Sequence, residues 1–276
     1  ISKNKISASF DQLLRIGPMS SSNVLEEFLL SFNGPQFLIK EKDSRNLDPI
    51  KKAIEYQFGL NKFVNQLLDK KGFNKITNKT LMPITNELID KGKKIKKIIK
   101  KHVLNNDHIT ELSLANLVPE IWPKNKPIMI SASSPIRDWL TFSGKEVFSR
   151  RCFSFRGASG IDGTLSIALG IARINDPLLL VTGDLSFLHD INGWLNQNAK
   201  EINLKILLID NHGGNIFNRL YKNKLSKLEI KNLFLMQSSV NWKKLAEAHE
   251  IPFINIISLE KLKEAFQWSL SIKKSV

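Results

Sequence analysis

Two residues with side-chain oxygens, Asp184 and Asn211, each follow a short apolar run typical of a buried parallel strand. The runs cover residues 178–181 and 206–209, and Phe187 to Leu195 between them show helical spacing, which predicts strand–helix–strand. In an open parallel sheet, ligands bind in the crevice at the carboxyl ends of neighbouring strands. A carboxylate and an amide oxygen at two such ends suit a hard cation such as Mg²⁺.

Each residue also has a simpler interpretation. Asp184 could cap the following helix, and Asn211 could be a turn residue beside Gly213. The two residues together, at adjacent strand ends, favour metal binding.

Two further stretches could bind anionic groups. A strand predicted at Ile128–Ile130 delivers Ser133 and Arg137 to its carboxyl end. The planar guanidinium of Arg137 suits a carboxylate, although a surface ion pair with Asp138 or another acid is the alternative. The second stretch, 155–163, is a glycine-rich turn before a predicted helix. By composition alone this turn is either a phosphate-cradling loop or a tight connection.

Together with Gly183–Ser186 and Asp210–Phe217, these two stretches resemble thiamine-diphosphate enzymes. Among them, the chain is similar to the 2-succinyl-5-enolpyruvyl-6-hydroxy-3-cyclohexene-1-carboxylate synthase family of menaquinone and phylloquinone synthesis. The resemblance implies that Asp184, Asn211 and the Gly213 carbonyl hold Mg²⁺, or alternatively Mn²⁺, against the diphosphate of thiamine diphosphate. It implies cofactor contacts from Gly160, Ile161, Gly183, Asp184, Leu185, Ser186, Asn211, Ile216 and Phe217.

The same resemblance assigns roles around the cofactor. Ile161 is expected to be the apolar wedge beneath the bent cofactor, and Ile216 and Phe217 form a wall over the thiazolium ring. Three residues are expected to act on substrate: Ser133, Arg137 and Arg156. The chain departs from the family pattern at Asn23, Ala132 and Phe155.

The implied reaction joins decarboxylated 2-oxoglutarate to isochorismate, in a cytoplasmic homo-oligomer that is a dimer or tetramer. The resemblance covers the central and C-terminal domains of the family. We therefore expect the pyrimidine-binding domain, with the glutamate that protonates the cofactor ring, to precede Ile1. On this expectation the chain alone is inactive.

The predicted fold is α/β, with two Rossmann-like parallel-sheet domains, the second binding the cofactor diphosphate. We expect a central domain at 1–75, a linker helix region at 76–105 and the thiamine-enzyme domain at 106–276. We also expect strands at 13–16, 37–39 and 253–256. Further helices are expected to begin at 23, 83 and 107. A helix at 242–249, capped by Ser238 or Ser239, and a closing helix at 259–270 complete the predicted elements.

The composition fits a soluble globular protein, with 42% apolar and 24% charged residues among 276. No apolar run is long enough for stable membrane insertion, and the single cysteine, Cys152, fits a reducing compartment. The net charge of +15 leaves open a basic nucleic-acid-binding module on a Rossmann-like scaffold. A non-catalytic remnant of the fold is the other alternative. The resemblance instead favours small-molecule substrates and no nucleic acid.

Overall fold

The computed structural model describes residues 10–19, 22–42, 45–69, 82–104, 108–155, 160–196 and 198–276. The chain divides into two compact units, residues 1–94 and 95–276, and the division lies within the long helix α4 (Met82–Val103). In the described part of the chain each unit holds one sheet, and neighbouring strands in both sheets are parallel. The predicted α/β class with two parallel sheets is confirmed.

The first unit contains a sheet of order β1-β2-β3, with β1 at Leu13–Ile16, β2 at Gln36–Ile39 and β3 at Ala53–Tyr56. Its described helices are α2 (Asn23–Ser31) and α3 (Leu60–Leu68). The two predicted strands are confirmed, whereas β3 was missed because its four residues, Ala-Ile-Glu-Tyr, are too few to show a clear strand pattern. The cap of α2 is the Ser22 hydroxyl, which accepts from the Leu25 N–H, and not Asn23.

The second unit has a four-stranded sheet of order β5-β4-β6-β7. Its strands are β4 (Ile128–Ile130), β5 (Cys152–Ser154), β6 (Leu178–Gly183) and β7 (Leu204–Ile209). Its α-helices are α5 (Glu111–Ile121), α6 (Ser134–Phe142), α7 (Thr164–Ala172), α8 (Asp184–His189), α9 (Ile216–Tyr221), α10 (Lys227–Leu233), α11 (Trp242–Ala248) and α12 (Leu262–Ser271).

Side chains on the two faces of this sheet enter two separate apolar cores. Leu179 and Val181 of β6 pack with residues of α5, α6 and α12, whereas Leu178 and Leu180 pack with α7. Each such buried side chain contributes about 1.5–3 kcal/mol relative to an exposed one. Because both faces are covered, the strand sequence is a continuous apolar run and not an alternating one.

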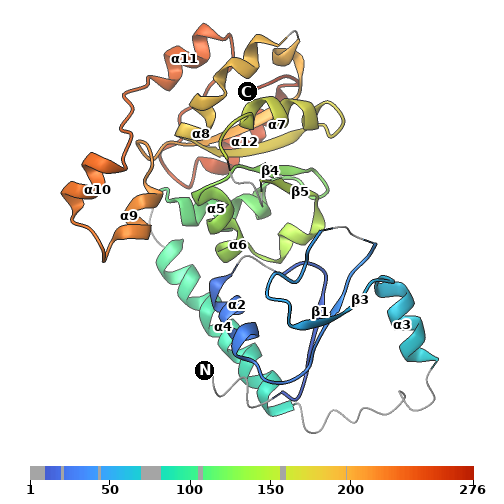
Figure 1. Cartoon of the computed structure of the whole chain (residues 1–276). Helices are drawn as coiled ribbons and strands as arrows, with labels where there is room; N and C mark the ends of the chain where they lie inside the picture. Colours follow the sequence, from blue (N-terminus) through green and yellow to red (C-terminus); the bar gives the residue numbers. More distant parts are fainter. Residues whose placement is uncertain are drawn as a thin grey trace. The chain divides into compact units, whose positions relative to one another are not determined.

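Helix α5 begins later than predicted because of its cap. The Thr110 hydroxyl accepts from the Ser113 N–H at 3.0 Å, and the Ser113 hydroxyl accepts from the Thr110 N–H at 2.9 Å. This reciprocal pair satisfies N–H groups at the helix start. It places Glu111 at the first helical position, beside α6, with which α5 lies side by side (Figure 1).

Three local predictions about the second unit were wrong. Residues 253–256 form no strand; Val276 instead lies beside β7, with backbone bonds from Ile206 N–H to the Val276 carbonyl (2.9 Å) and from Val276 N–H to Leu204 (3.0 Å). The helix predicted at 187–195 is divided into α8 and a 3-10 helix, Ile191–Leu195. The cap of α11 is Asn241, whose side chain accepts from Lys244 N–H, and not Ser238 or Ser239.

No helix in the described part of the chain combines the length and apolar content that crossing a bilayer requires.

Candidate functional site

The polar motifs of the sequence meet at one edge of the second sheet. Parallel register sets Ile130 of β4 opposite Val181 of β6, and Gly183 of β6 opposite Ile209 of β7. Residues that follow these strands therefore leave the sheet at the same, carboxyl edge. Ser133, Asp184 and Asn211 are among them, as the sequence predicted.

Asp184 joins the ends of β6 and β7. Its side chain is buried, and its Oδ1 accepts from the Leu185 N–H at 2.7 Å. Its Oδ2 accepts from the N–H groups of Gly213 at 2.7 Å and Asn211 at 3.3 Å. Three N–H groups thus fix the carboxylate in one orientation at the base of the 210–215 loop.

Asp184 and Asp210 differ in their ease of ionisation. Burial raises the pKa of Asp184, and the neighbouring Asp210 carboxylate raises it further against the opposing N–H bonds. Burial also disfavours the charge on Asp210, but bonds from the His212 N–H (2.9 Å) and the Trp242 indole (2.7 Å) hold the Asp210 pKa below its ordinary value. A positive charge beside Asp184 would favour its ionised form.

Asn211 carries a buried acceptor without a partner. Its Nδ2 donates to Glu111 Oε1 at 2.5 Å, while no described residue donates to its Oδ1. Leaving such an atom unpaired costs about 1–3 kcal/mol. A bound cation would satisfy this oxygen, so the arrangement fits a metal ligand.

Glycine is required at position 213. The backbone there has φ 85°, and a Cβ would lie 1.8 Å from the Met236 carbonyl oxygen. Only glycine adopts this left-handed conformation without strain and also allows the close approach. The glycine thereby brings its N–H onto Asp184 and presents its own carbonyl within the same loop.

The predicted ligand set is one carboxylate, one amide and one backbone carbonyl. The described residues contain no cluster of three or more His, Cys, Asp or Glu side chains that could hold a metal ion. A site for a hard cation does not need such a cluster, because Mg²⁺ accepts carbonyl oxygens, water and substrate phosphates as ligands. The observed residues fit this kind of site.

Residues 143–276 match the family model described as "Thiamine pyrophosphate enzyme, C-terminal TPP binding domain". The chain is 60% identical over 274 residues to 2-succinyl-5-enolpyruvyl-6-hydroxy-3-cyclohexene-1-carboxylate synthase from Prochlorococcus marinus strain MIT 9312. The aligned region covers 99% of this chain and 47% of that protein. The synthase of strain NATL2A is 41% identical over 267 residues, covering 96% of this chain and 45% of that protein. Over nearly all of its length the chain is similar to these synthases.

The chain spans about half the length of these curated synthases. A solved structure, benzoylformate decarboxylase from Polynucleobacter necessarius, superposes with a TM-score of 0.58 at 14% identity, covering 96% of this chain and 48% of that one. At this identity the likeness supports the fold alone, an α/β chain with parallel sheets.

The motif that follows β4 is partly exposed. Ser133 has φ 74° and precedes α6, and its carbonyl accepts from Arg137 Nη1 at 2.7 Å. Arg137 is exposed, and the alternative that it pairs with Asp138 is wrong, because Asp138 pairs with Arg219. The departure at Ala132 is buried beside this motif.

The glycine-rich turn is tied to the Gly183–Ser186 motif. The Thr164 hydroxyl donates to the Ile161 carbonyl at 2.9 Å and shares a 2.9 Å hydrogen bond with the Ser186 hydroxyl. Gly160 is exposed and Ile161 half-buried. Arg156 lies outside the described residues.

The remaining predicted cofactor contacts flank Asp184 or follow the 210–215 loop. Gly183 ends β6, and Leu185 is half-buried in the first turn of α8. Ile216 and Phe217 begin α9. The Phe217 ring lies 5.1 Å from that of Phe234, measured between centroids, so this wall belongs to an aromatic cluster with Tyr221. Their contacts with a cofactor stay a prediction.

Sequence analysis missed two residues in the hydrogen-bond network of Asn211. Glu111 holds the Asn211 amide, and Arg219 binds Glu111. Glu111 could only have been noticed as the acid after the Thr110 cap, and nothing in the sequence links it to a site that lies 100 positions away. A cavity of about 1060 Å³ opens beside them, lined by β7, α11, α12 and the irregular segment 251–257.

Proposed function

We propose that the carboxyl edge of the second sheet binds the diphosphate of thiamine diphosphate through Mg²⁺, with Mn²⁺ as the alternative ion. Asp184, Asn211 and the Gly213 carbonyl are the proposed protein ligands. The observation that carries the proposal is the buried Oδ1 of Asn211, which has no partner among the described residues. It lies next to a carboxylate that three N–H groups fix in place. The match of residues 143–276 to a thiamine pyrophosphate domain supports it.

We further propose that the whole protein is a transferase that joins decarboxylated 2-oxoglutarate to isochorismate in menaquinone or phylloquinone biosynthesis, because its relatives are named as the corresponding synthase. When bound, thiamine diphosphate supplies the electron sink for the decarboxylation. Ile161, Ile216 and Phe217 would fix the cofactor rings. The charged and hydroxyl groups of Arg137, Arg156 and Ser133 would orient substrate carboxylates.

The same proposal includes the oligomeric state, the location and the domain boundaries of the protein. They are a homo-oligomer, either dimer or tetramer, a cytoplasmic location, and domains at 1–75, 76–105 and 106–276. We propose that turnover needs residues beyond this chain, because the curated relatives are about twice as long.

Calorimetric titration of the chain with thiamine diphosphate, with and without Mg²⁺, tests the cofactor proposal. We expect binding that depends on Mg²⁺ and that Asp184→Ala weakens by about 100-fold, because loss of a residue that only supports a metal ligand already costs about 10–100-fold. Glu264→Ala is the matched control, because it removes one negative charge from the exposed face of α12.

Unchanged binding by Asp184→Ala, or binding that ignores Mg²⁺, would reject the proposed ligand set. The basic nucleic-acid module makes a different prediction, namely binding of DNA or RNA that weakens steeply with salt and is insensitive to Asp184→Ala. A non-catalytic remnant would bind neither kind of ligand.

A further inference from the structure

Asn211 belongs to a hydrogen-bond network with charged residues from three helices. Its Nδ2 donates to Glu111 Oε1 of α5, and Arg219 of α9 donates to Glu111 Oε2. The same guanidinium binds Asp138 of α6 through two bonds, Nη1 to Oδ1 at 2.5 Å and Nη2 to Oδ2 at 2.8 Å. One arginine therefore bridges two carboxylates, and one of these holds the proposed metal ligand.

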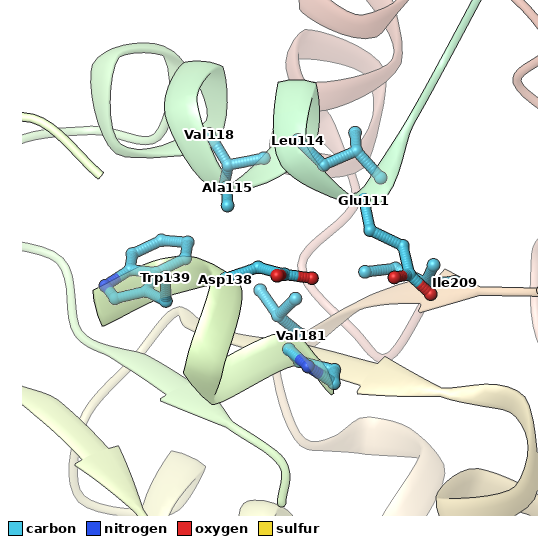
Figure 2. Close-up of a pocket in the computed structure, with 9 residues that line it drawn as sticks. Glu111, Leu114, Ala115, Val118, Asp138, Trp139, Val181 and Ile209 are labelled. Atoms are coloured by element: carbon cyan, nitrogen blue, oxygen red, sulfur yellow. The ribbon is translucent and has the colours of Figure 1, made fainter. Parts of the chain in front are cut away.

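Both carboxylates of this network are shielded from water. The side chain of Glu111 is 15% exposed and that of Asp138 is 5% exposed. Figure 2 shows the two carboxylates projecting from α5 and α6 into the space above Val181 and Ile209 of the sheet. Bonding to Asp138 raises the pKa of Arg219, so the guanidinium stays charged and offsets one of the two negative charges.

The network decides which end of the Asn211 amide faces the proposed cation. An ionised carboxylate can only accept hydrogen bonds, so the NH₂ group must lie against Glu111. The carbonyl oxygen then points away from Glu111, and this is the buried oxygen without a described partner. Rotating the amide by a half-turn would place oxygen against oxygen at Glu111 and a nitrogen, which cannot bind a cation, at the metal position.

We infer that Glu111 is a positioning residue for metal binding, which fixes the Asn211 amide with its oxygen toward the cation. Arg219 and Asp138 in turn fix the rotamer of Glu111. The inference rests on the proposed function, because it assigns Glu111 a purpose only if Asn211 binds a metal. It predicts that Glu111 affects the metal requirement of cofactor binding more than cofactor affinity itself.

The test is the Mg²⁺ concentration that gives half-maximal binding of thiamine diphosphate by calorimetry, measured for the whole chain. We expect Glu111→Ala to raise this concentration by about 10-fold or more, the order found for residues that orient metal ligands. At saturating Mg²⁺ its affinity for thiamine diphosphate should return to within about 3-fold of wild type. The Mg²⁺ requirement of Glu111→Gln should lie between those of wild type and Glu111→Ala, because the amide oxygen of glutamine can still accept from Asn211.

The matched control is Glu120→Ala, which removes an exposed acid from the same helix and should leave the Mg²⁺ requirement unchanged. A second readout needs no metal. The side-chain NH₂ signals of Asn211, identified by their loss in Asn211→Asp, should change in spectra of ¹⁵N-asparagine-labelled Glu111→Ala and stay unchanged in Glu120→Ala.

The outcomes separate the two proposals. Metal-dependent binding by wild type with an unchanged Mg²⁺ requirement in Glu111→Ala, or unchanged Asn211 signals, overturns the positioning role alone. An affinity loss in Glu111→Ala that saturating Mg²⁺ does not restore also overturns it, because general damage to the fold would explain that loss. Wild type that binds without Mg²⁺, or not at all, overturns the proposed metal site and this inference together.

Discussion

The Asp184 carboxylate accepts the Gly213 N–H at 2.7 Å, which joins the first residue of α8 to the loop that follows β7. The bond depends on a backbone conformation, φ 85° at Gly213, that side chains rarely permit. The same loop carries Asn211, so a single contact orients a carboxylate and sets the position of two other proposed ligands.

Gly213→Ala is expected to destabilise the second unit by at least about 2 kcal/mol. The added Cβ would lie 1.8 Å from the Met236 carbonyl oxygen, and alanine is also strained at this φ. Urea denaturation of the two proteins measures the difference in the free energy of unfolding.

Gly170→Ala in α7 provides the control for that change. Its new Cβ would have no described atom within 4 Å, and alanine is favoured over glycine in a helix by up to about 1 kcal/mol. A Gly213→Ala protein as stable as Gly170→Ala would contradict the geometry of the 210–215 loop.

Arg219→Ala is expected to destabilise the chain by about 3 kcal/mol. The loss comes mainly from Asp138, because its buried carboxylate would lose its ion-pair partner. Asp138→Asn should reduce the effect of Arg219→Ala, and a double-mutant cycle with denaturant measures this coupling. Additive effects of the two substitutions would show that the ion pair does not contribute.

Lys205 gives the second unit a distinct pH dependence. Its side chain is 1% exposed and donates to the carbonyl of Lys274 at 2.7 Å, while burial lowers its pKa from 10.5 to about 8. Between these values the unfolded chain binds the proton that the folded chain has lost. The free energy of unfolding should therefore rise with pH across this window, by at most about 1.4 kcal/mol per pH unit.

Denaturation of wild type and Lys205→Met at pH 7.5 and pH 9.5 checks this sign. Other titrating groups contribute equally to both proteins, so the difference in stability between them isolates Lys205. Wild type should gain stability relative to Lys205→Met at the higher pH. Parallel changes in the two proteins would show that Lys205 titrates normally.

Removing the metal should abolish stabilisation by the cofactor. If thiamine diphosphate binds through Mg²⁺, then both ligands at about 100 times the dissociation constant stabilise the folded state by about 2.7 kcal/mol. Scanning fluorimetry should show a higher melting temperature with both ligands, and EDTA should return it to the value of the free protein. A shift that survives EDTA would argue against a metal-dependent site.

The sequence was sufficient where a local pattern specified the structure. Apolar runs predicted β6 and β7, and the polar residues after them predicted one shared edge that brings Asp184 close to Asn211. The strand expected at 253–256 shows the limit of such patterns, because Val276 lies beside the first part of β7 instead. Which segment lies beside a strand edge depends on tertiary packing, which the local pattern of a segment does not specify.

The charged network around Asn211 was beyond sequence analysis for a different reason. Glu111 and Arg219 lie 108 positions apart on two different helices, and both have residue types that usually occupy a solvated surface. Their role appears only when the packing of α5 on α6 leaves two carboxylates facing one guanidinium. Chemistry that depends on such a meeting of helices has no signature in either helix alone.

The placement of the proposed ligands also determines which unit of the chain is stabilised when the cofactor binds. Asp184, Asn211 and Gly213 all belong to residues 95–276, one of the two compact units into which the chain divides. A ligand held by these three stabilises directly only the unit whose native form it recognises. Slower amide hydrogen exchange on binding would then be concentrated in residues 95–276 and would distinguish this unit from residues 1–94.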